Sequence, residues 1–403
     1  MDFRDSPAEA EFRTEVREFI KREHTRDSAT EGAQSAYQAA AQGGEAAMKT
    51  YKDWMKKLSS KGWVAPAWPK EYGGAGMTIM EQFIFNEELA QARAPRPGGI
   101  GIAMAGPTII VYGDDDQKKQ HLSGMLSGEM TWCQGFSEPG SGSDLASLQT
   151  RAVRDGDDYV VNGQKIWTSG AQYADRMILL ARTDPEAPKH KGISYFLLDM
   201  KSPGVSVRPL VNMAGTSGFN EVFFDNVRVP RKDLLGEENR GWYVGTTTLD
   251  FERSSIGTSI AQGQSVEDLI EWVKTSKKGP LHPTVRLELA ERAIEAHAAR
   301  LMSYQVISMQ NRGLVPNHEA SAVKIYAAEL NQRITNTSLK AAGLFGQLDP
   351  SRKDGDNATM RYSAKKGRFV RTYLQAVAST IAGGTSEINR GIIATRGLGL
   401  PRG

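Results

Sequence analysis

The chain of 403 residues has one cysteine and few histidines. With Cys133 alone it can form no internal disulfide and no metal site made only of cysteines, and a single cysteine fits a reducing compartment. The six histidines are scattered, and neither G-x-S-x-G nor H-E-x-x-H occurs. A serine hydrolase or a zinc-dependent enzyme is therefore poorly supported, and we expect no bound metal.

A concentrated block of Lys and Arg and a long apolar run are also missing. The net charge of +3 argues for neither a nucleic-acid partner nor a membrane surface. No apolar segment approaches the roughly 20 residues that span a bilayer, and the acidic residues 1–16 contain no hydrophobic core like that of a secretory signal. With 39% hydrophobic residues, we expect a soluble, cytoplasmic protein of one large or two to three ordinary domains.

The first third of the sequence is predicted to be helical. Apolar residues recur at helical spacing in 7–23, 51–58, 80–92 and 115–126, and Ser6-Pro7 is a typical helix start. These segments predict an N-terminal group of helices.

Three stretches between these helices lack regular periodicity. Residues 24–48 are rich in Ala, Gln, Gly and Ser and are predicted to be a long connection. Residues 62–78 combine aromatics with Pro and Gly, which predicts a structured loop. The glycines between 98 and 106 lack the G-x-G-x-x-G spacing and follow no strand, so a dinucleotide site is not favoured there.

From Trp132 the texture changes to short β-branched and aromatic runs separated by turn residues, which predicts strands. Asp155-Gly156 and Asn162-Gly163 both lie between apolar runs and predict two tight hairpin turns. The loop SEPGSGSD, residues 137–144, contains small residues that let backbone N–H groups approach a phosphate or a planar ring. Strand patterns continue to Pro230.

From Trp242 onward the periodicity is helical again, with breaks at 281–283, 313–317 and 344–356. Four or more helices of this kind are expected to form an antiparallel bundle.

The order SEPGSGSD, NGQKIWTSGA and an apolar strand ending in ART resembles the acyl-CoA dehydrogenase family, bacterial FadE-like members included. The C-terminal segment IAGGTSEINRGIIATRGLGLPRG resembles that family as well, so the resemblance covers nearly the whole chain. It implies an α+β fold with an N-terminal helical domain (1–130), a middle β-barrel or sheet domain (131–240) and a C-terminal four-helix bundle (241–403).

The resemblance also implies FAD as the cofactor. In the family the first of these segments wraps the flavin and the second sets a tryptophan against its ring. Carried over position by position, the flavin-side and adenine-side contacts would be Phe136, Ser137, Gly142, Ser143, Trp167, Thr168, Ser169, Thr385 and Glu387.

The reaction implied is α,β-dehydrogenation of an acyl-CoA thioester to the trans-2-enoyl-CoA. It needs a carboxylate base for the α-proton and a hydride acceptor, which in the family is flavin N5. Most relatives carry the base directly before the Gly-Thr of the C-terminal signature, where this chain has Gly383. Isovaleryl- and long-chain-type members carry it in a stretch like Leu-Asp-Leu-Glu-Arg, which here reads LDFER, residues 249–253.

Glu252 is therefore the predicted base, with Asp250 and Glu387 as weaker candidates. A plainer interpretation of Glu252 is a solvated or ion-paired surface residue, because it adjoins an arginine. Gly383 would leave room for the base and offer its N–H to the thioester, and Arg253 is predicted to contact the substrate.

Three segments depart from the family pattern. NMAGTSGFNEVFF, residues 212–224, lacks a common Arg-x-Ser-Asp pattern, and residues 272–286 lack the Arg-x-x-Phe-Gly segment that relatives donate to a neighbour's FAD pyrophosphate. The later Gly-Gly-x-Gly turn reads LFGQLDPSR, residues 344–352. Lys277 and Lys278 could substitute electrostatically, without the planar fork of an arginine.

Three functional interpretations therefore remain open. The first is an acyl-CoA dehydrogenase that passes electrons to an electron-transferring flavoprotein. The second is a partner subunit of a heteromeric dehydrogenase for bulky, steroid-type CoA esters, with an incomplete FAD site. The third is a flavin oxidase or monooxygenase on the same fold. The resemblance implies a tetramer, either homomeric or α2β2.

Overall fold

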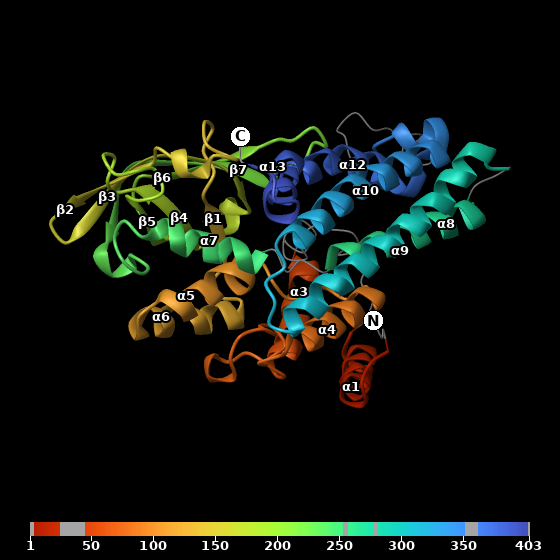
Figure 1. Ribbon diagram of the computed structural model, residues 1–403, viewed down its shortest axis with the longest axis horizontal. Helices are drawn as coiled ribbons and strands as arrows, with labels where there is room; N and C mark the ends of the chain where they lie inside the picture. The colour runs from red at the N-terminus through yellow and green to blue at the C-terminus, as the bar shows by residue number, and fades with distance from the viewer. Residues whose placement is uncertain (1–3, 25–44, 253–256, 277–279, 351–361, 402–403) are drawn as a thin grey trace.

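Helical, β and helical groups of elements follow one another along the chain (Figure 1). The computed structural model describes residues 4–24, 45–252, 257–276, 280–350 and 362–401, and in 45–48, 250–252, 257–258 and 276 it describes the backbone alone. The expected α+β order is confirmed. Over those described ranges, no helix is long and apolar enough to cross a membrane.

The N-terminal group contains the α-helices α1 (Pro7–Glu23), α3 (Glu45–Ser59), α4 (Ile79–Gln91), α5 (Gly106–Tyr112) and α6 (Asp115–Ser127). Ser6, Thr78 and Asp114 begin α1, α4 and α6 with capping boxes, which satisfy backbone N–H groups at the helix starts. Only α3 differs clearly from expectation, because it begins six residues before the predicted Tyr51, in the good helix formers EAAMK. The rest of the predicted connection, residues 25–44, lies outside the described residues.

The aromatic loop after α3 is fixed by packing. Trp68 is buried, and its indole N–H donates to the carbonyl of Ile102 at 2.9 Å. A Cβ on Gly106 would lie 1.9 Å from the Trp68 ring. The glycine at 106 therefore allows α5 to approach this indole, which is a packing role.

The middle group is a seven-stranded sheet curled into a half-barrel, with the order β1-β4-β2-β3-β7-β6 and β5 paired to β4 (Figure 1). Its strands are β1 (Trp132–Gly135), β2 (Arg151–Asp155), β3 (Asp158–Ser169), β4 (Arg176–Arg182), β5 (Ile193–Asp199), β6 (Val205–Leu210) and β7 (Phe219–Pro230). Every pairing is antiparallel except β1 with β4 and β2 with β4.

The two predicted hairpin turns have different outcomes. Asp155 pairs with Asp158 across a tight turn that contains Gly156 at φ 64°, so this hairpin is confirmed. Asn162-Gly163 forms no hairpin, because the chain continues in β3 with a register shift opposite β7. A Cβ on Gly163 would lie 2.7 Å from Thr150 Cα, so the glycine permits a close approach at a β-bulge.

The helix α7 (Gly241–Glu252) follows the sheet and packs against β5 and α5. A Cβ on Gly241 would lie 2.4 Å from the Ser194 carbonyl carbon, so a glycine is needed where α7 begins. Val244 shares one buried cluster with Tyr195 of β5 and with the tryptophans of the N-terminal group. The first and middle groups are therefore packed together through α7.

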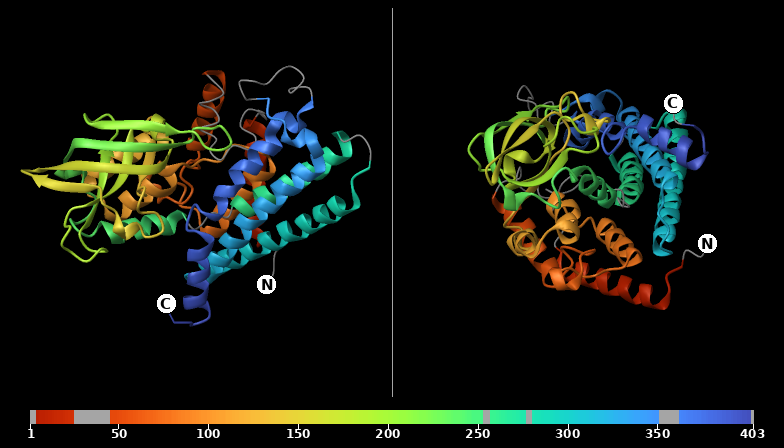
Figure 2. Two further views of the ribbon diagram at one scale, coloured as in Figure 1. Left: turned by 90° about the horizontal axis from the view of Figure 1, so that it is seen from above. Right: turned by 60° about the vertical axis from the view of Figure 1, so that its left-hand side comes forward.

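The C-terminal group contains α8 (Gly257–Ser276), α9 (Pro283–Asn311), α10 (His318–Ala342), α12 (Arg368–Ala376) and α13 (Ser386–Ile392). The long helices α8, α9 and α10 lie side by side, away from the sheet (Figure 2). Arg300 of α9 and Arg13 of α1 both pair with the buried Glu87 of α4, and Arg13 also reaches Glu88. These ion pairs join the two helical groups.

Candidate active site

The loop of residues 137–144 is held to β3 by a buried ion pair. Lys165 of β3 is fully buried, and its Nζ lies 2.8 Å from Glu138 Oε1 and 3.0 Å from the carbonyl oxygen of Phe136. The same carboxylate accepts the backbone N–H groups of Gln149 and Thr150 at 2.6 and 2.9 Å. Glu138 therefore joins the start of the loop, its end and the strand behind it.

The ion pair is charged at neutral pH. Burial alone would raise the pKa of Glu138, but the Lys165 ammonium and the donated hydrogen bonds lower it below its ordinary value of 4.5. Burial lowers the pKa of Lys165 to about 8, against the opposing attraction of Glu138. The carboxylate therefore stays ionised beside a lysine that is still protonated at pH 7.

Beside this loop, Trp167 has an unusual conformation. Its φ is 59°, in the left-handed region that costs a side-chain-bearing residue of the order of 1 kcal/mol. The register of β3 against β7 shifts between Lys165 and Thr168, and the indole is 61% exposed with an edge contact to Phe219. A large apolar ring held outward at some energetic cost is suited to binding a planar ligand.

The other predicted flavin contacts lie close by in the chain fold. Ile166 donates its N–H to the carbonyl of Ser137 at 2.9 Å, which puts the start of the loop next to Trp167. Gly142 and Ser143 are exposed, Gly142 has open space around its Cα, and Ser169 is exposed. The Thr168 hydroxyl is buried and has no hydrogen-bond partner among the described residues, while Phe136 is buried behind the loop. These features fit a flavin.

The predicted base lies at the end of α7. Glu252 is the last residue of this helix as the structure describes it, and its side chain is outside the description, as is Arg253. One turn earlier, the buried Thr248 hydroxyl lies 2.9 Å from Thr108 Oγ1 of α5 and 3.2 Å from Tyr195 Oη of β5. This buried hydroxyl network fixes the rotation of α7 against its neighbours.

Gly383 lies in a tight corner before α13. Gly383 and Gly384 have φ values of 64° and 84°, and Asn389 Nδ2 donates to the carbonyls of Gly384 and Thr385, each at 3.0 Å. Thr385 caps α13 by accepting the N–H of Ile388. A glutamate at 383 would have to adopt a left-handed conformation, so this corner as described is suited to glycine.

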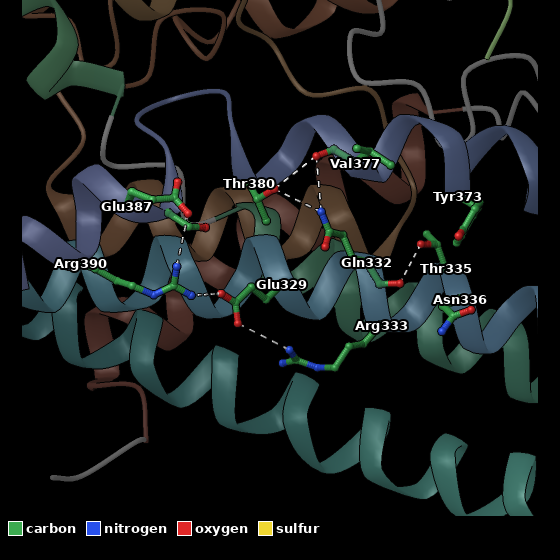
Figure 3. A pocket seen from close by; sticks show the side chains of 11 residues that line it. Glu329, Gln332, Arg333, Thr335, Asn336, Tyr373, Val377, Thr380, Glu387 and Arg390 are labelled. Atoms are coloured by element: carbon green, nitrogen blue, oxygen red, sulfur yellow. Dashed lines mark hydrogen bonds and ion pairs between the residues drawn. The ribbon is translucent and has the colours of Figure 1, made fainter. Parts of the chain in front are cut away.

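Glu387 lies at the edge of a polar cleft of about 620 Å³ between α10, α13 and the turn that precedes it (Figure 3). Its carboxylate lies 3.6 Å from Arg390, which also contacts Glu329 at 2.5 Å. The buried Ser386 hydroxyl lines this cleft and has no hydrogen-bond partner among the described residues. Thr385 and Glu387 thus belong to the helical domain and, where the chain is described, share no hydrogen bond with the Trp167 region.

Four supporting residues were not found from the sequence: Glu138, Lys165, Thr248 and Asn389. Glu138 stands inside the glycine-rich loop and could have been singled out as the one carboxylate at its start. Lys165 resembles any polar residue of a half-exposed strand, and Thr248 any threonine of a helix. Their partners are distant in sequence, so no local pattern marks them.

Three family models match the chain in order. The N-terminal domain of acyl-CoA dehydrogenase matches residues 6–129, the middle domain 133–227 and the C-terminal domain 239–398.

Individual relatives match over nearly the whole chain. Acyl-CoA dehydrogenase FadE26 of Mycobacterium tuberculosis is 37% identical over 87% of this chain and 88% of its own length. Two solved structures, a Tcur3481-Tcur3483 steroid ACAD and the ChsE4-ChsE5 complex from Mycobacterium tuberculosis, superpose with TM-scores of 0.84 and 0.82. They are 36% and 34% identical to this chain, and each match covers 100% of both chains.

Proposed function

The chain belongs to the FAD-dependent acyl-CoA dehydrogenase family, and from that premise we propose that it binds FAD and dehydrogenates an acyl-CoA thioester to the trans-2-enoyl-CoA. One observation carries the proposal: an exposed Trp167 held at φ 59° beside a loop that a buried ion pair anchors. A strained, outward aromatic of this kind is what a flavin ring needs for support.

The residues of this chain would hold the cofactor in two places. Trp167 supports the ring, while Ser137, Gly142, Ser143, Thr168 and Ser169 supply small groups and hydroxyls around it. Thr385 and Glu387 are assigned to the adenine half. When bound, FAD supplies the hydride acceptor for the β-hydrogen.

Glu252 is the proposed base that takes the α-proton. It follows Thr248 by four residues, which puts position 252 on the helical face that contacts α5 and β5. The N–H of Gly383 is proposed to donate to the thioester carbonyl, which stabilises the negative charge that develops as the proton leaves. Arg253 is proposed to contact the substrate.

The substrate class is proposed from the relatives. The names of the two solved structures each contain a pair of chains, and one of them is described as a steroid ACAD. By analogy, this chain is proposed to act on a bulky, steroid-type CoA ester, with a second chain of the same family in an α2β2 assembly. This proposal also accounts for the missing Arg-x-x-Phe-Gly segment, because the second chain would supply that contact. An electron-transferring flavoprotein is the proposed electron acceptor.

The reaction can be tested by product analysis. The purified chain, alone and co-expressed with a candidate partner, is incubated with steroid-type, branched and straight acyl-CoA esters and an artificial electron acceptor. A product lighter by two hydrogens, formed without oxygen, is expected from the bulky ester. Turnover that requires oxygen and releases peroxide would favour the oxidase instead, and conversion only of short straight esters would contradict the substrate class.

The strained tryptophan gives a separate prediction. Trp167→Gly should bind FAD at least about 10-fold more weakly, because the ring support is lost. The apoprotein should stay within about 1 kcal/mol of the native stability, because glycine adopts a positive φ without strain and offsets the lost Phe219 contact. FAD titration by fluorescence and urea unfolding of the apoprotein measure the two effects. Tyr173→Ala, which removes another exposed aromatic, is the control; equal weakening in both variants would refute the assigned role.

A further inference from the structure

The outer face of α9 carries an apolar stripe. Leu287, Ile294 and Leu301 are 69%, 70% and 39% exposed and are seven residues apart, so they lie along one side of the helix. The opposite side of α9 is buried against α8, α10 and α4, and α9 lies on the outer side of the bundle (Figure 2). Isolated exposed leucines need no explanation, but a stripe at heptad spacing indicates a helix partner.

This stripe is symmetric about Ile294. Leu287 and Leu301 lie seven residues to either side of it, and Ala290 and Ala298 lie four residues to either side. When two such helices run antiparallel with their Ile294 residues on a two-fold axis, leucine faces leucine and isoleucine faces isoleucine. An isologous contact requires this self-complementarity, since the same patch serves both partners.

The polar residues of the face follow the same symmetry. Glu291 and His297 lie three residues to either side of Ile294, so each glutamate would face the histidine of the other copy. Glu291 is exposed and also pairs with Arg292 of its own helix. Of the other charges near the stripe, Glu288 is paired with Lys340, and Arg286 would face Met302 of the other copy. No like charges meet in this arrangement.

We propose that this face of α9 is a two-fold interface between two copies of this chain, with Ile294 on the axis. The occupant is a second copy because the apolar, small and polar positions each map onto a complementary position of the same helix. A helix of unrelated sequence would not require this palindrome. The proposal holds whether or not the chain is a dehydrogenase, since it rests on α9 alone.

Disulfide trapping tests the proposed axis. The only native cysteine, Cys133, is buried, so an introduced surface cysteine can be followed without interference. Ile294→Cys should give a disulfide-linked dimer under mild oxidation, because only a residue on the axis meets itself within the roughly 4.4–6.8 Å that a disulfide needs between Cα atoms. Leu287→Cys is the matched control, since it lies about 10 Å along the helix from the axis and should link only when Leu301→Cys is added.

A second variant tests the contribution of the face to assembly. Ile294→Asp should lower the mass of the assembled protein by light scattering, while Val153→Asp, an exposed apolar residue of the sheet, should not. Linking of Leu287→Cys as readily as Ile294→Cys would overturn the two-fold register. An absence of linked dimer in the full assembly, with circular dichroism showing folded protein, would show that a different chain or none occupies the face.

Discussion

Glu252→Gln is expected to bind FAD and acyl-CoA but to reduce the flavin about 10²–10⁴-fold more slowly than the native chain, the usual range for loss of a general base. The amide keeps the size and hydrogen bonding of the carboxylate but cannot accept the α-proton. The loss should therefore appear in the rate of bleaching at saturating acyl-CoA and leave the binding constant nearly unchanged. Anaerobic stopped-flow absorption measures both.

Asp250→Asn is the matched control for this prediction, because it removes a carboxylate two residues away on the same helix. It should bleach at nearly the native rate. If Glu252→Gln bleaches normally and Asp250→Asn or Glu387→Gln does not, the base has been assigned to the wrong residue. If all three bleach normally, a carboxylate elsewhere, on this chain or a partner, serves as the base.

The second large effect is expected at the anchored loop. Glu138→Gln should destabilise the apoprotein by about 3–5 kcal/mol, because it leaves the buried Lys165 ammonium without its counter-charge. The amide cannot match the carboxylate's acceptance of the Gln149 and Thr150 N–H groups, so the loop should also lose order and FAD affinity should fall. Urea unfolding and FAD titration measure these changes.

The double variant Glu138→Gln with Lys165→Met distinguishes a charge effect from a packing effect. Removing both charges should cost less than removing Glu138 alone, since no unpaired charge stays buried. A double variant as unstable as the sum of its parts would show that the two residues act independently.

Acid pH should weaken the same ion pair. The pKa of Glu138 is lowered in the folded protein, so its stabilising contribution is present above its ordinary pKa of 4.5 and is lost as pH falls through the lower folded value. Glu138→Gln should therefore lose less stability than the native chain over that acid range.

The sequence predicted the features that depend on neighbouring residues. The periods of α1, α4 and α6 and the Asp155-Gly156 turn are local, and each was predicted to within about two residues. Asn162-Gly163 misled because its preference for a turn is overridden by pairing with β7, a contact that no neighbouring residue specifies.

The candidate site could be predicted only in part for the same reason. The resemblance pointed to Trp167 and to the loop of 137–144, but it could not reveal the backbone strain at φ 59°. Glu138 and Lys165 are 27 residues apart, and Thr108 and Thr248 are 140 apart. Tertiary packing alone brings such pairs together, so the groups that hold the site in place became visible only in the fold.

The most direct test of the central claim is the visible absorption spectrum of the purified chain, with FAD counted per chain before and after anaerobic addition of acyl-CoA. The account predicts bound flavin that bleaches with a bulky acyl-CoA ester, either in the chain alone or after its partner is added. A chain that stays colourless both alone and with candidate partners, or that binds FAD and bleaches with no acyl-CoA ester, would contradict it.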